Sequence, residues 1–279
     1  MTEPIIRCNG LSHTYKGMVL ALDQIELQVH EGEILGIIGQ NGSGKTTLVK
    51  HLNGLLKPTS GTVTVDGMDT RKVTVNTLSR TVGYVFQNPN HQLFANSVNA
   101  EISFGPSNLG LGAAEANQRI EEAVQFFDLQ VFRTIHPYRL SFPIRKMVCM
   151  AAVFAMRPKV MVLDEPTTGQ DHAGVDRVHE LIRKLQESHT TVIMVSHDMR
   201  LEAAVADRIV VLRDGRILAE GSPRQVFAQA EILKSTNLQA PQVAQLGQRI
   251  GLGLTLTVPE FIQQYTNWRP VSEAEDHGE

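Results

Sequence analysis

The sequence predicts an α/β fold built around a mostly parallel sheet. Three uninterrupted apolar runs of strand length occupy residues 34–38, 160–163 and 191–195, and stretches with helical spacing separate them. Such runs are typical of strands covered on both faces, and their alternation with helices is typical of parallel sheets. Each run is followed by glycine or polar residues, and open sheets of this kind bind ligands at the carboxyl ends of their strands. We therefore expect a ligand site along one edge of the sheet.

Further strands are predicted on either side of this core. Apolar and polar residues alternate between residues 6 and 29, which predicts a strand-rich N-terminal edge. Residues 208–212 are a fourth candidate strand, followed by a hairpin turn at Asp214-Gly215. The stretch 46–55, directly after a glycine-rich loop, has the spacing of a helix.

The chain divides into regions of different character. An α/β domain is predicted over residues 1–227, with a helical subdomain inserted at about 88–155, of which 114–127 is the clearest helix. Residues 228–268 carry short helical patterns broken by proline and glycine, so we expect a small C-terminal extension. The acidic tail 269–279 has no apolar anchors and is expected to be disordered.

Composition excludes several classes of function. The chain has 279 residues, 42% of them hydrophobic, and a formal net charge of −3, so nothing draws it electrostatically to nucleic acid. Cys8 and Cys149 lack the spacing of a metal site and are expected to be reduced thiols. The N-terminus lacks the pattern of a signal peptide, and the longest apolar stretch, 147–156, is too short for the ~20 residues that span a bilayer. Any membrane role is therefore expected to come through a partner protein.

A glycine-rich loop lies between the first apolar run and the following helix. Residues 39–46 read GQNGSGKT and fit the phosphate-loop pattern G-x-x-x-x-G-K-[ST] in its required place. Glycines let backbone N–H groups converge on phosphate oxygens, and the helix N-terminus adds partial positive charge. Lys45 is expected to reach the β- and γ-phosphates of ATP, and the Thr46 hydroxyl to ligate Mg²⁺. The candidate ATP-binding residues of this segment are Gly39, Gln40, Asn41, Gly42, Ser43, Gly44, Lys45, Thr46 and Thr47.

Polar residues with catalytic potential end the other two apolar runs. Asp164 is the expected acid beside the metal, and Glu165 is the candidate base that polarises the attacking water. An acidic pair after a strand more commonly caps a helix, but the phosphate loop upstream favours the catalytic interpretation. His197 follows the third run and could approach the γ-phosphate, although a lone histidine is more often structural.

An ordered set of motifs resembles the ATP-binding subunits of ABC transporters over roughly residues 5–226. The motifs are Tyr15, the phosphate loop, Gln87 in VFQNP, Leu140-Ser141, LDEPT at 163–167, Gly169-Gln170-Asp171 and His197. The resemblance implies that Tyr15 stacks on adenine, although an ordinary strand-end tyrosine is the alternative. It implies that Gln87 senses magnesium and couples to the membrane subunit, and that Asp171 lies in a loop that contacts a second ATPase subunit.

The same resemblance implies the roles of the remaining site residues. The Mg²⁺ ligands that it implies are Thr46, Gln87 and Asp164. The catalytic residues that it implies are Lys45, Glu165 and His197, the last as the switch histidine near the γ-phosphate.

A narrower set of residues resembles the ATPase subunits of energy-coupling factor (ECF) importers, which drive uptake of vitamins or of cobalt and nickel ions. The set is NPNHQLF at 88–94, FGP at 104–106 and NLG at 108–110. This resemblance implies that Gln92, Leu93 and Phe94 contact a transmembrane coupling protein; the alternative is that Leu93 and Phe94 pack inside the helical subdomain. It also implies that the C-terminal extension stabilises a dimer, with a lid over this chain's own core as the alternative.

One motif departs from the family pattern. Where ABC subunits read Leu-Ser-Gly-Gly-Gln, this chain reads Leu-Ser141-Phe142-Pro143-Ile144. In the family, two subunits pack head to tail, and the signature glycines of one approach the γ-phosphate bound by the other. Phe142 is bulky and Pro143 has no N–H, so the resemblance implies a weak site; one lost charge-assisted donor commonly costs ~1.5–3 kcal/mol. The helix can still start there, because Ser141 can cap it and its first turn tolerates proline. The alternative is a tolerated variant with a rearranged backbone.

The predicted function is ATP hydrolysis coupled to import of a vitamin or transition-metal ion at the cytoplasmic face of the cell membrane. ATP and Mg²⁺ are the expected cofactors. The expected partners are a second ATPase subunit with an intact signature, a transmembrane coupling protein and a substrate-binding membrane protein, and no nucleic acid. Specificity in such a complex lies in another chain, so no residue here is assigned to the cargo.

Three alternative functions remain open. They are the ATPase of another ABC transporter, a soluble ABC protein acting on DNA or ribosomes, and a regulatory subunit that no longer hydrolyses ATP. The last is disfavoured because Glu165 and His197 fill both catalytic positions.

Overall fold

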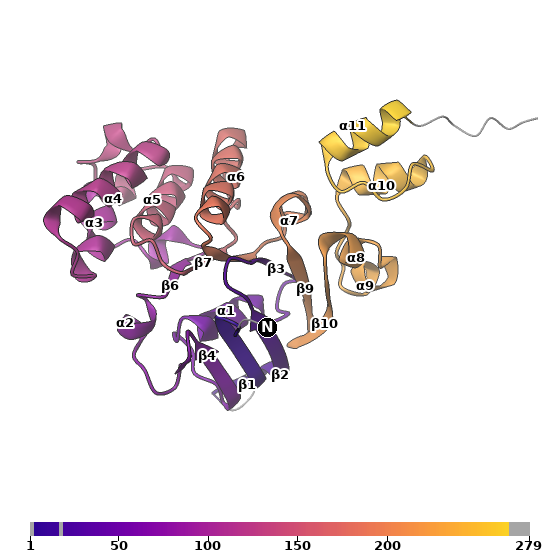
Figure 1. The fold of residues 1–279 in the computed structure, drawn as a ribbon, viewed down its shortest axis with the longest axis horizontal. Helices are drawn as coiled ribbons and strands as arrows, with labels where there is room; N and C mark the ends of the chain where they lie inside the picture. Colours follow the sequence, from indigo (N-terminus) through magenta and orange to yellow (C-terminus); the bar gives the residue numbers. More distant parts are fainter. Residues whose placement is uncertain (1–2, 17–18, 268–279) are drawn as a thin grey trace, which may run out of the picture.

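The computed structural model describes residues 3–16 and 19–267, and its centre is a six-stranded sheet (Figure 1). The strand order is β10-β9-β3-β8-β7-β6, and neighbours are parallel except for the hairpin of β9 and β10. The strands are β3 (Ile34–Ile38), β6 (Val82–Val85), β7 (Val160–Asp164), β8 (Thr191–Val195), β9 (Arg208–Arg213) and β10 (Arg216–Gly221). The predicted α/β fold is confirmed, because the three apolar runs form β3, β7 and β8 in the interior of the sheet.

An antiparallel sheet forms the N-terminal edge of the molecule. Its strand order is β2-β1-β4-β5, and its members are β1 (Ile6–Tyr15), β2 (Val19–Val29), β4 (Ser60–Val65) and β5 (Met68–Asp69). Its apolar side chains join those of helix α1 (Lys45–Leu52) and of one face of the central sheet in one buried cluster. The sheet and α1 therefore hold the phosphate loop from one side.

Helices predominate between β6 and β7, and Figure 1 shows α3, α4 and α5 grouped beside this edge of the sheet. The elements there are η1 (Pro89–His91), α3 (Val98–Asn108), α4 (Ala113–Phe126), η2 (Gln130–Phe132), η3 (Pro137–Arg139) and α5 (Phe142–Phe154), and the short helix α2 (Val75–Leu78) precedes β6. The helix expected at 114–127 corresponds to α4.

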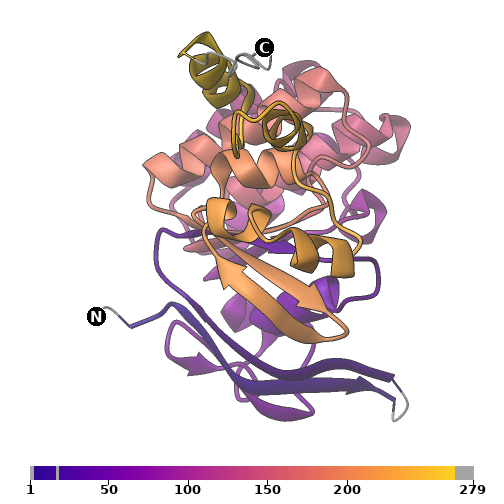
Figure 2. The same ribbon diagram turned by 90° about the vertical axis from the view of Figure 1, so that its right-hand side faces the viewer.

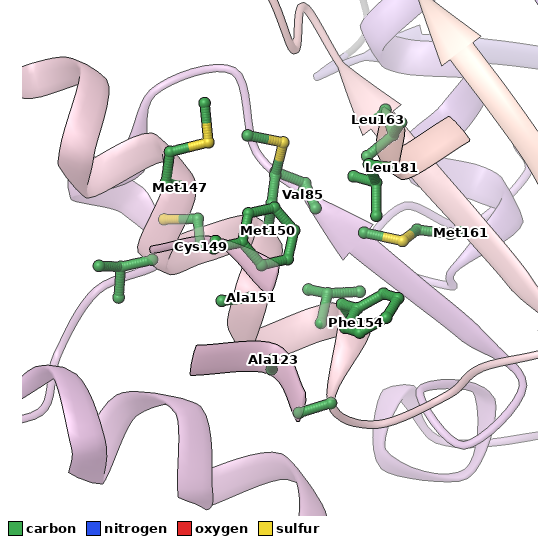
Figure 3. Close-up of a cluster of buried hydrophobic side chains, with 14 of the residues drawn as sticks. Val85, Ala123, Met147, Cys149, Met150, Ala151, Phe154, Met161, Leu163 and Leu181 are labelled. Carbon is green, nitrogen blue, oxygen red and sulfur yellow. The ribbon is translucent and has the colours of Figure 1, made fainter. Parts of the chain in front are cut away.

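The helical segment shares its core with the central sheet. Met150 and Phe154 of α5 belong to the same buried cluster as Met161 and Leu163 of β7 and Leu181 of α6 (His172–Glu187) (Figure 3). The intervening residues of β7 point to the opposite face, because side chains alternate along a strand. Helix α5 therefore shares one core with β7, the strand that ends in Asp164.

The C-terminal region consists of short helices. The helices that follow β10 are α8 (Pro223–Phe227), α9 (Ala230–Ser235), α10 (Gln242–Arg249) and α11 (Val258–Asn267), whereas α7 (Met199–Val205) lies between β8 and β9. Leu233 and Leu256 are buried in a cluster with Ile38, Ile209 and Val211 of the sheet. Helices α10 and α11 also leave apolar side chains exposed: Leu246, Val258 and Ile262.

Figure 2 shows α10 and α11 at the end of the molecule opposite the N-terminal sheet. The tail 269–279, predicted to be disordered, lies outside the described residues. Among the residues that the structure describes, no helix combines the length and apolar character needed to cross a bilayer.

Candidate nucleotide-binding site

The phosphate loop leaves the central sheet where β3 ends and leads into α1. Gly44 precedes the helix with φ 104°, a left-handed conformation that glycine adopts without strain. A Cβ on Gly44 would lie 2.6 Å from the Ala21 carbonyl oxygen, and one on Gly39 would lie 2.3 Å from that of Leu212. The loop therefore fits between β2 and β9 only because these positions carry no side chain.

Lys45 is folded over its own loop. Its buried Nζ donates to the carbonyl oxygens of Gly39 at 2.7 Å and Gln40 at 3.0 Å, which uses two of the three hydrogens of the ammonium. Burial lowers the pKa of Lys45, while the nearby carboxylates of Glu165 and Asp164 act in the opposite direction. The arrangement places a cation where phosphate oxygens would meet the N-terminus of α1.

A pocket of about 420 Å³ lies against this loop, a size typical of ligand sites. It brings together segments that are far apart in the sequence: Tyr15, residues 19–21, residues 41–47, Gln87, Glu165, Val195 and His197. The Tyr15 hydroxyl lies 3.2 Å from Oγ1 of Thr47, which ties the candidate adenine platform to α1. The loop residues Gly39 and Gln40 contribute by accepting hydrogen bonds from Lys45, not by lining the pocket.

Asp164 is buried at the end of β7 and has one oxygen without a partner. Its Oδ2 accepts a 2.8 Å hydrogen bond from the Tyr84 hydroxyl, whereas no described group bonds to the buried Oδ1. A buried carboxylate oxygen without a donor is costly, and a cation relieves that cost. The oxygen donors of Thr46, Gln87 and Asp164 fit the preference of Mg²⁺ for oxygen ligands.

Tyr84 is a candidate site residue that no motif in the sequence indicates. It lies within the apolar strand β6, where a tyrosine reads as one more core residue. Its hydroxyl fixes the orientation of the Asp164 carboxylate, and burial and the neighbouring carboxylate raise the pKa of Tyr84. Only the pairing of β6 with β7 brings the two residues together.

Glu165 and His197 meet at the adjacent strand ends. His197 Nε2 lies 3.2 Å from Glu165 Oε1. The other carboxylate oxygen, Oε2, accepts from the Thr168 hydroxyl at 3.3 Å and from the backbone N–H of His197 at 3.4 Å. Glu165 has φ 51°, a left-handed conformation that is uncommon outside glycine. Burial raises the pKa of Glu165, against the effect of His197. A carboxylate with a raised pKa beside a phosphate loop is suited to accept a proton from water.

The altered signature segment packs against this chain's own aspartate loop. The Phe142 ring fills the space beside Gly169, where a Cβ would lie 2.7 Å from a ring carbon, and Gln170 Nε2 donates to the Pro143 carbonyl at 3.3 Å. Pro143 lies in the first turn of α5, as expected, and Ser141 occupies the N-cap position but makes no side-chain capping bond. The next helix, α6, is capped by Asp171, which accepts from the Gly174 N–H at 2.9 Å.

Comparison with known proteins identifies the family. The family model for ABC transporters matches residues 22–168, more than half of the chain. This chain belongs to the ABC transporter family. It is 42% identical over 260 residues to the energy-coupling factor transporter ATP-binding protein EcfA1 of Symbiobacterium thermophilum, covering 90% of each chain. The predicted resemblances to ABC ATPases and to their ECF subgroup are confirmed.

Two further ABC proteins extend this comparison. An ABC transporter ATP-binding protein of Caldanaerobacter subterraneus is 43% identical over 93% of this chain, which spans 46% of that relative's length. The solved structure of cbiO1 from Clostridium perfringens, part of the ABC transporter complex cbiONQ, matches with a TM-score of 0.73 and 33% identity. That match covers 88% of this chain and 100% of cbiO1. The chain therefore carries the ATPase cassette of the family.

The prediction that Gln92, Leu93 and Phe94 of this ABC subunit all lie at the surface is wrong for Leu93. Its side chain is only 4% exposed and belongs to the core shared by α3, α5 and the sheet. Phe94 is 63% exposed and meets Phe104 edge-on, with ring centroids 4.7 Å apart. Gln92 is turned inward by its hydrogen bonds to the backbone of Phe86 and Cys149.

Proposed function

We propose that this chain is the ATP-hydrolysing subunit of an ECF-type ABC importer that couples hydrolysis to uptake of a vitamin or transition-metal ion. The observation that carries the proposal is the Glu165–His197 contact beside Lys45 in a single pocket. The names of two relatives support the transport role: one is an energy-coupling factor ATP-binding protein, and the other is part of an ABC transporter complex.

Each part of the pocket has a distinct role in ATP hydrolysis. Tyr15 stacks on adenine, and the loop N–H groups with Lys45 bind the phosphates. Thr46 and Gln87 line the pocket, and Asp164 is buried at the end of β7; these three residues would hold Mg²⁺, which would supply positive charge to the phosphate oxygens.

The chemical step belongs to the Glu165–His197 pair. Glu165 takes the proton of the attacking water, and its contact with the His197 ring fixes the direction of its carboxylate. His197 is itself partly exposed toward the pocket, in position to contact the γ-phosphate.

The partners of the proposed importer are a second ATPase subunit, a transmembrane coupling protein and a substrate-binding membrane protein, at the cytoplasmic face of the membrane. An apolar groove of about 370 Å³ between α2, β6 and α3 supports the membrane contact. Phe104 borders this groove and pairs with exposed Phe94, so the two rings extend one apolar surface. Charged side chains are few along the groove, as suits an apolar segment of a membrane protein.

The ATPase pair is proposed to be asymmetric, with a different chain as the second subunit. Pro143 cannot donate an N–H. The Phe142 ring packs beside Gly169, so its bulk remains at the signature segment. The exposed apolar residues of α10 and α11 are the proposed pairing surface of the C-terminal extension.

Two substitutions in the assembled complex test the catalytic assignment. Lys45→Ala should weaken ATP binding roughly 10- to 100-fold, because a charge-assisted contact to the phosphates is lost. Glu165→Gln should leave ATP affinity nearly unchanged and lower turnover at its site by about 10²-fold, the usual scale for a lost general base. Nucleotide titration and phosphate release measure the two effects.

The matched controls are Lys50→Ala on the same helix as Lys45 and the exposed Glu187→Gln. Both should behave as wild type. Unchanged ATP affinity in Lys45→Ala, or wild-type turnover in Glu165→Gln at its own site, would overturn the assignment.

A further inference from the structure

Helix α5 carries a lysine, Lys146, whose side chain is completely buried. Its Nζ donates to three backbone carbonyl oxygens: Phe86 at 3.0 Å, Gln87 at 2.8 Å and Asp164 at 3.1 Å. An ammonium has three hydrogens, so this set of acceptors satisfies it completely. The lysine is therefore bound inside the protein in one defined position.

The three carbonyls belong to the two segments that flank the proposed metal site. Two of them lie on the loop that follows β6 and carries the Gln87 side chain. The third ends β7, where the same residue supplies the Asp164 carboxylate. A single cation on α5 thus fixes the spacing between two residues that are assigned to the same ion.

A second contact, through Gln92, fastens the Gln87 loop to α5. Gln92 accepts from the Phe86 N–H at 3.1 Å and donates to the Cys149 carbonyl at 3.0 Å. The loop is therefore held to α5 at Phe86 and Gln87 through Lys146, and at Gln92 through Cys149. The signature segment begins the same helix, four residues before Lys146.

Apolar packing does not explain a lysine at this position. The residues that follow it on α5, Met147 to Met150, are buried and apolar, and burial lowers the pKa of Lys146 to about 8 because an ammonium is removed from water. An apolar side chain could fill the same volume, but it would leave the three backbone carbonyl oxygens without their donor. The ammonium therefore matters for its hydrogen bonds to the two segments.

We propose that Lys146 is a positioning residue for ATP hydrolysis, whose ammonium holds the Gln87 loop and the end of β7 in register for the metal–phosphate group. The inference rests on the proposed function. Lys146 also joins α5, and with it the signature segment, to both segments of the proposed metal site. A membrane partner that displaces the Gln87 loop would then also displace α5, the helix that begins with the signature segment.

Three substitutions at this position separate the hydrogen bonds from the volume. Lys146→Met keeps the length of the side chain and removes every donor, so three buried carbonyls lose their partner. Lys146→Gln keeps a neutral amide with two hydrogens on a shorter chain. Lys234→Met, on an exposed part of α9, is the matched control.

The experiment uses the assembled complex and three readouts. The first is affinity for a fluorescent ATP analogue with and without Mg²⁺, the second is turnover, and the third is hydrogen exchange of the 84–92 peptide. For Lys146→Met we expect unchanged affinity without Mg²⁺, a loss of roughly 10- to 100-fold in Mg²⁺-dependent affinity and in turnover, and faster exchange of the peptide. Lys146→Gln should lie between Met and wild type.

Three results would overturn the inference. They are wild-type Mg²⁺ dependence in Lys146→Met, equal losses in the Met and Gln variants, or unchanged hydrogen exchange in both. If Lys146→Met does not fold, the Gln variant alone decides, since a purely structural role would lower its melting temperature without changing Mg²⁺ dependence or turnover of the folded fraction. A wild-type complex without ATPase activity would instead refute the proposed function, and Mg²⁺-dependent binding and hydrogen exchange would still test Lys146.

Discussion

At the scale of single residues, the least expected group is the carboxyl of Glu202 on α7. It is completely buried, and neither of its oxygens has a hydrogen-bond partner among the described residues. It lies against β3, where a Cβ on Gly36 would come 2.0 Å from Oε2. Burial raises the pKa of Glu202 well above its ordinary value of 4.5, and the charges of Glu165 and Asp198 act in the same direction.

The raised pKa gives Glu202 a defined effect on stability. The folded protein holds this proton more tightly than the unfolded chain does, so the group's contribution is fully present below pH 4.5 and falls as pH rises toward the folded pKa. Glu202→Met should therefore raise the free energy of unfolding by ~1–3 kcal/mol at pH 8 and by less at pH 5. Denaturant unfolding at the two pH values measures the difference, with the exposed Glu187→Met as control. An equal gain at both pH values would contradict the assignment.

At the scale of elements, the segment 91–94 shows how an apolar pair can divide between core and surface. The short helix η1 ends at His91; two residues later Leu93 turns inward, while the next residue, Phe94, turns outward toward Phe104. The Phe94 N–H is held by the buried carboxylate of Glu101, which also binds the N–H of Ala95. The direction of each side chain is thus fixed by this turn.

Charge substitutions at these two positions should have opposite consequences. Leu93→Glu places a carboxylate in the core and should destabilise the chain by roughly 3 kcal/mol or more. Phe94→Glu should leave folding and ATP binding intact and abolish co-purification with the transmembrane partner. Melting temperature, ATP titration and pull-down from solubilised membranes measure these effects.

Val131→Glu is the matched control, because Val131 is 78% exposed in the same helical segment. It should affect neither folding nor assembly. Normal assembly of a folded Phe94→Glu variant would remove Phe94 from the proposed contact.

Elements governed by simple patterns are the ones that the sequence predicts well. Strands β3, β7 and β8 are buried on both faces, so each appears as a continuous apolar run with nearly correct bounds. The phosphate loop is equally easy to identify in the sequence, because close backbone contacts require its glycines. The burial of Lys146 is not predicted, and that of Leu93 is only one of two alternatives, for a common reason. Their burial depends on partners distant in the sequence, and neither helical spacing nor residue type encodes those partners.

At the scale of the whole molecule, this chain combines a complete phosphate-loop half-site with an altered signature. In the proposed head-to-tail pair with an intact partner signature, the site that holds this chain's Lys45 and Glu165 would contain every proposed catalytic group. The opposite site would depend on the altered signature, in which Phe142 is bulky and Pro143 has no N–H to donate. The two sites of the proposed pair should therefore turn over at different rates.

Paired glutamate substitutions in the complex test this asymmetry. Glu165→Gln in this chain should remove most of the ATPase activity, whereas the equivalent change in the partner should remove much less, since its site is already slow by about 10²–10³. Steady-state phosphate release from the two single variants is the measurement. Equal losses, or robust activity from this chain alone, would show that Pro143 does not impair its site.

The contact between Phe142 and Gly169 also bears on how such a chain can change over evolutionary time. Returning position 142 to glycine would open a gap beside the aspartate loop, and position 169 cannot readily fill it, because φ is 76° there. The two positions are thus coupled: the bulky ring at position 142 is accommodated because position 169 has no side chain, and glycine at position 142 alone would leave that space unfilled. Regaining the ordinary signature at this position is therefore expected to carry a packing cost.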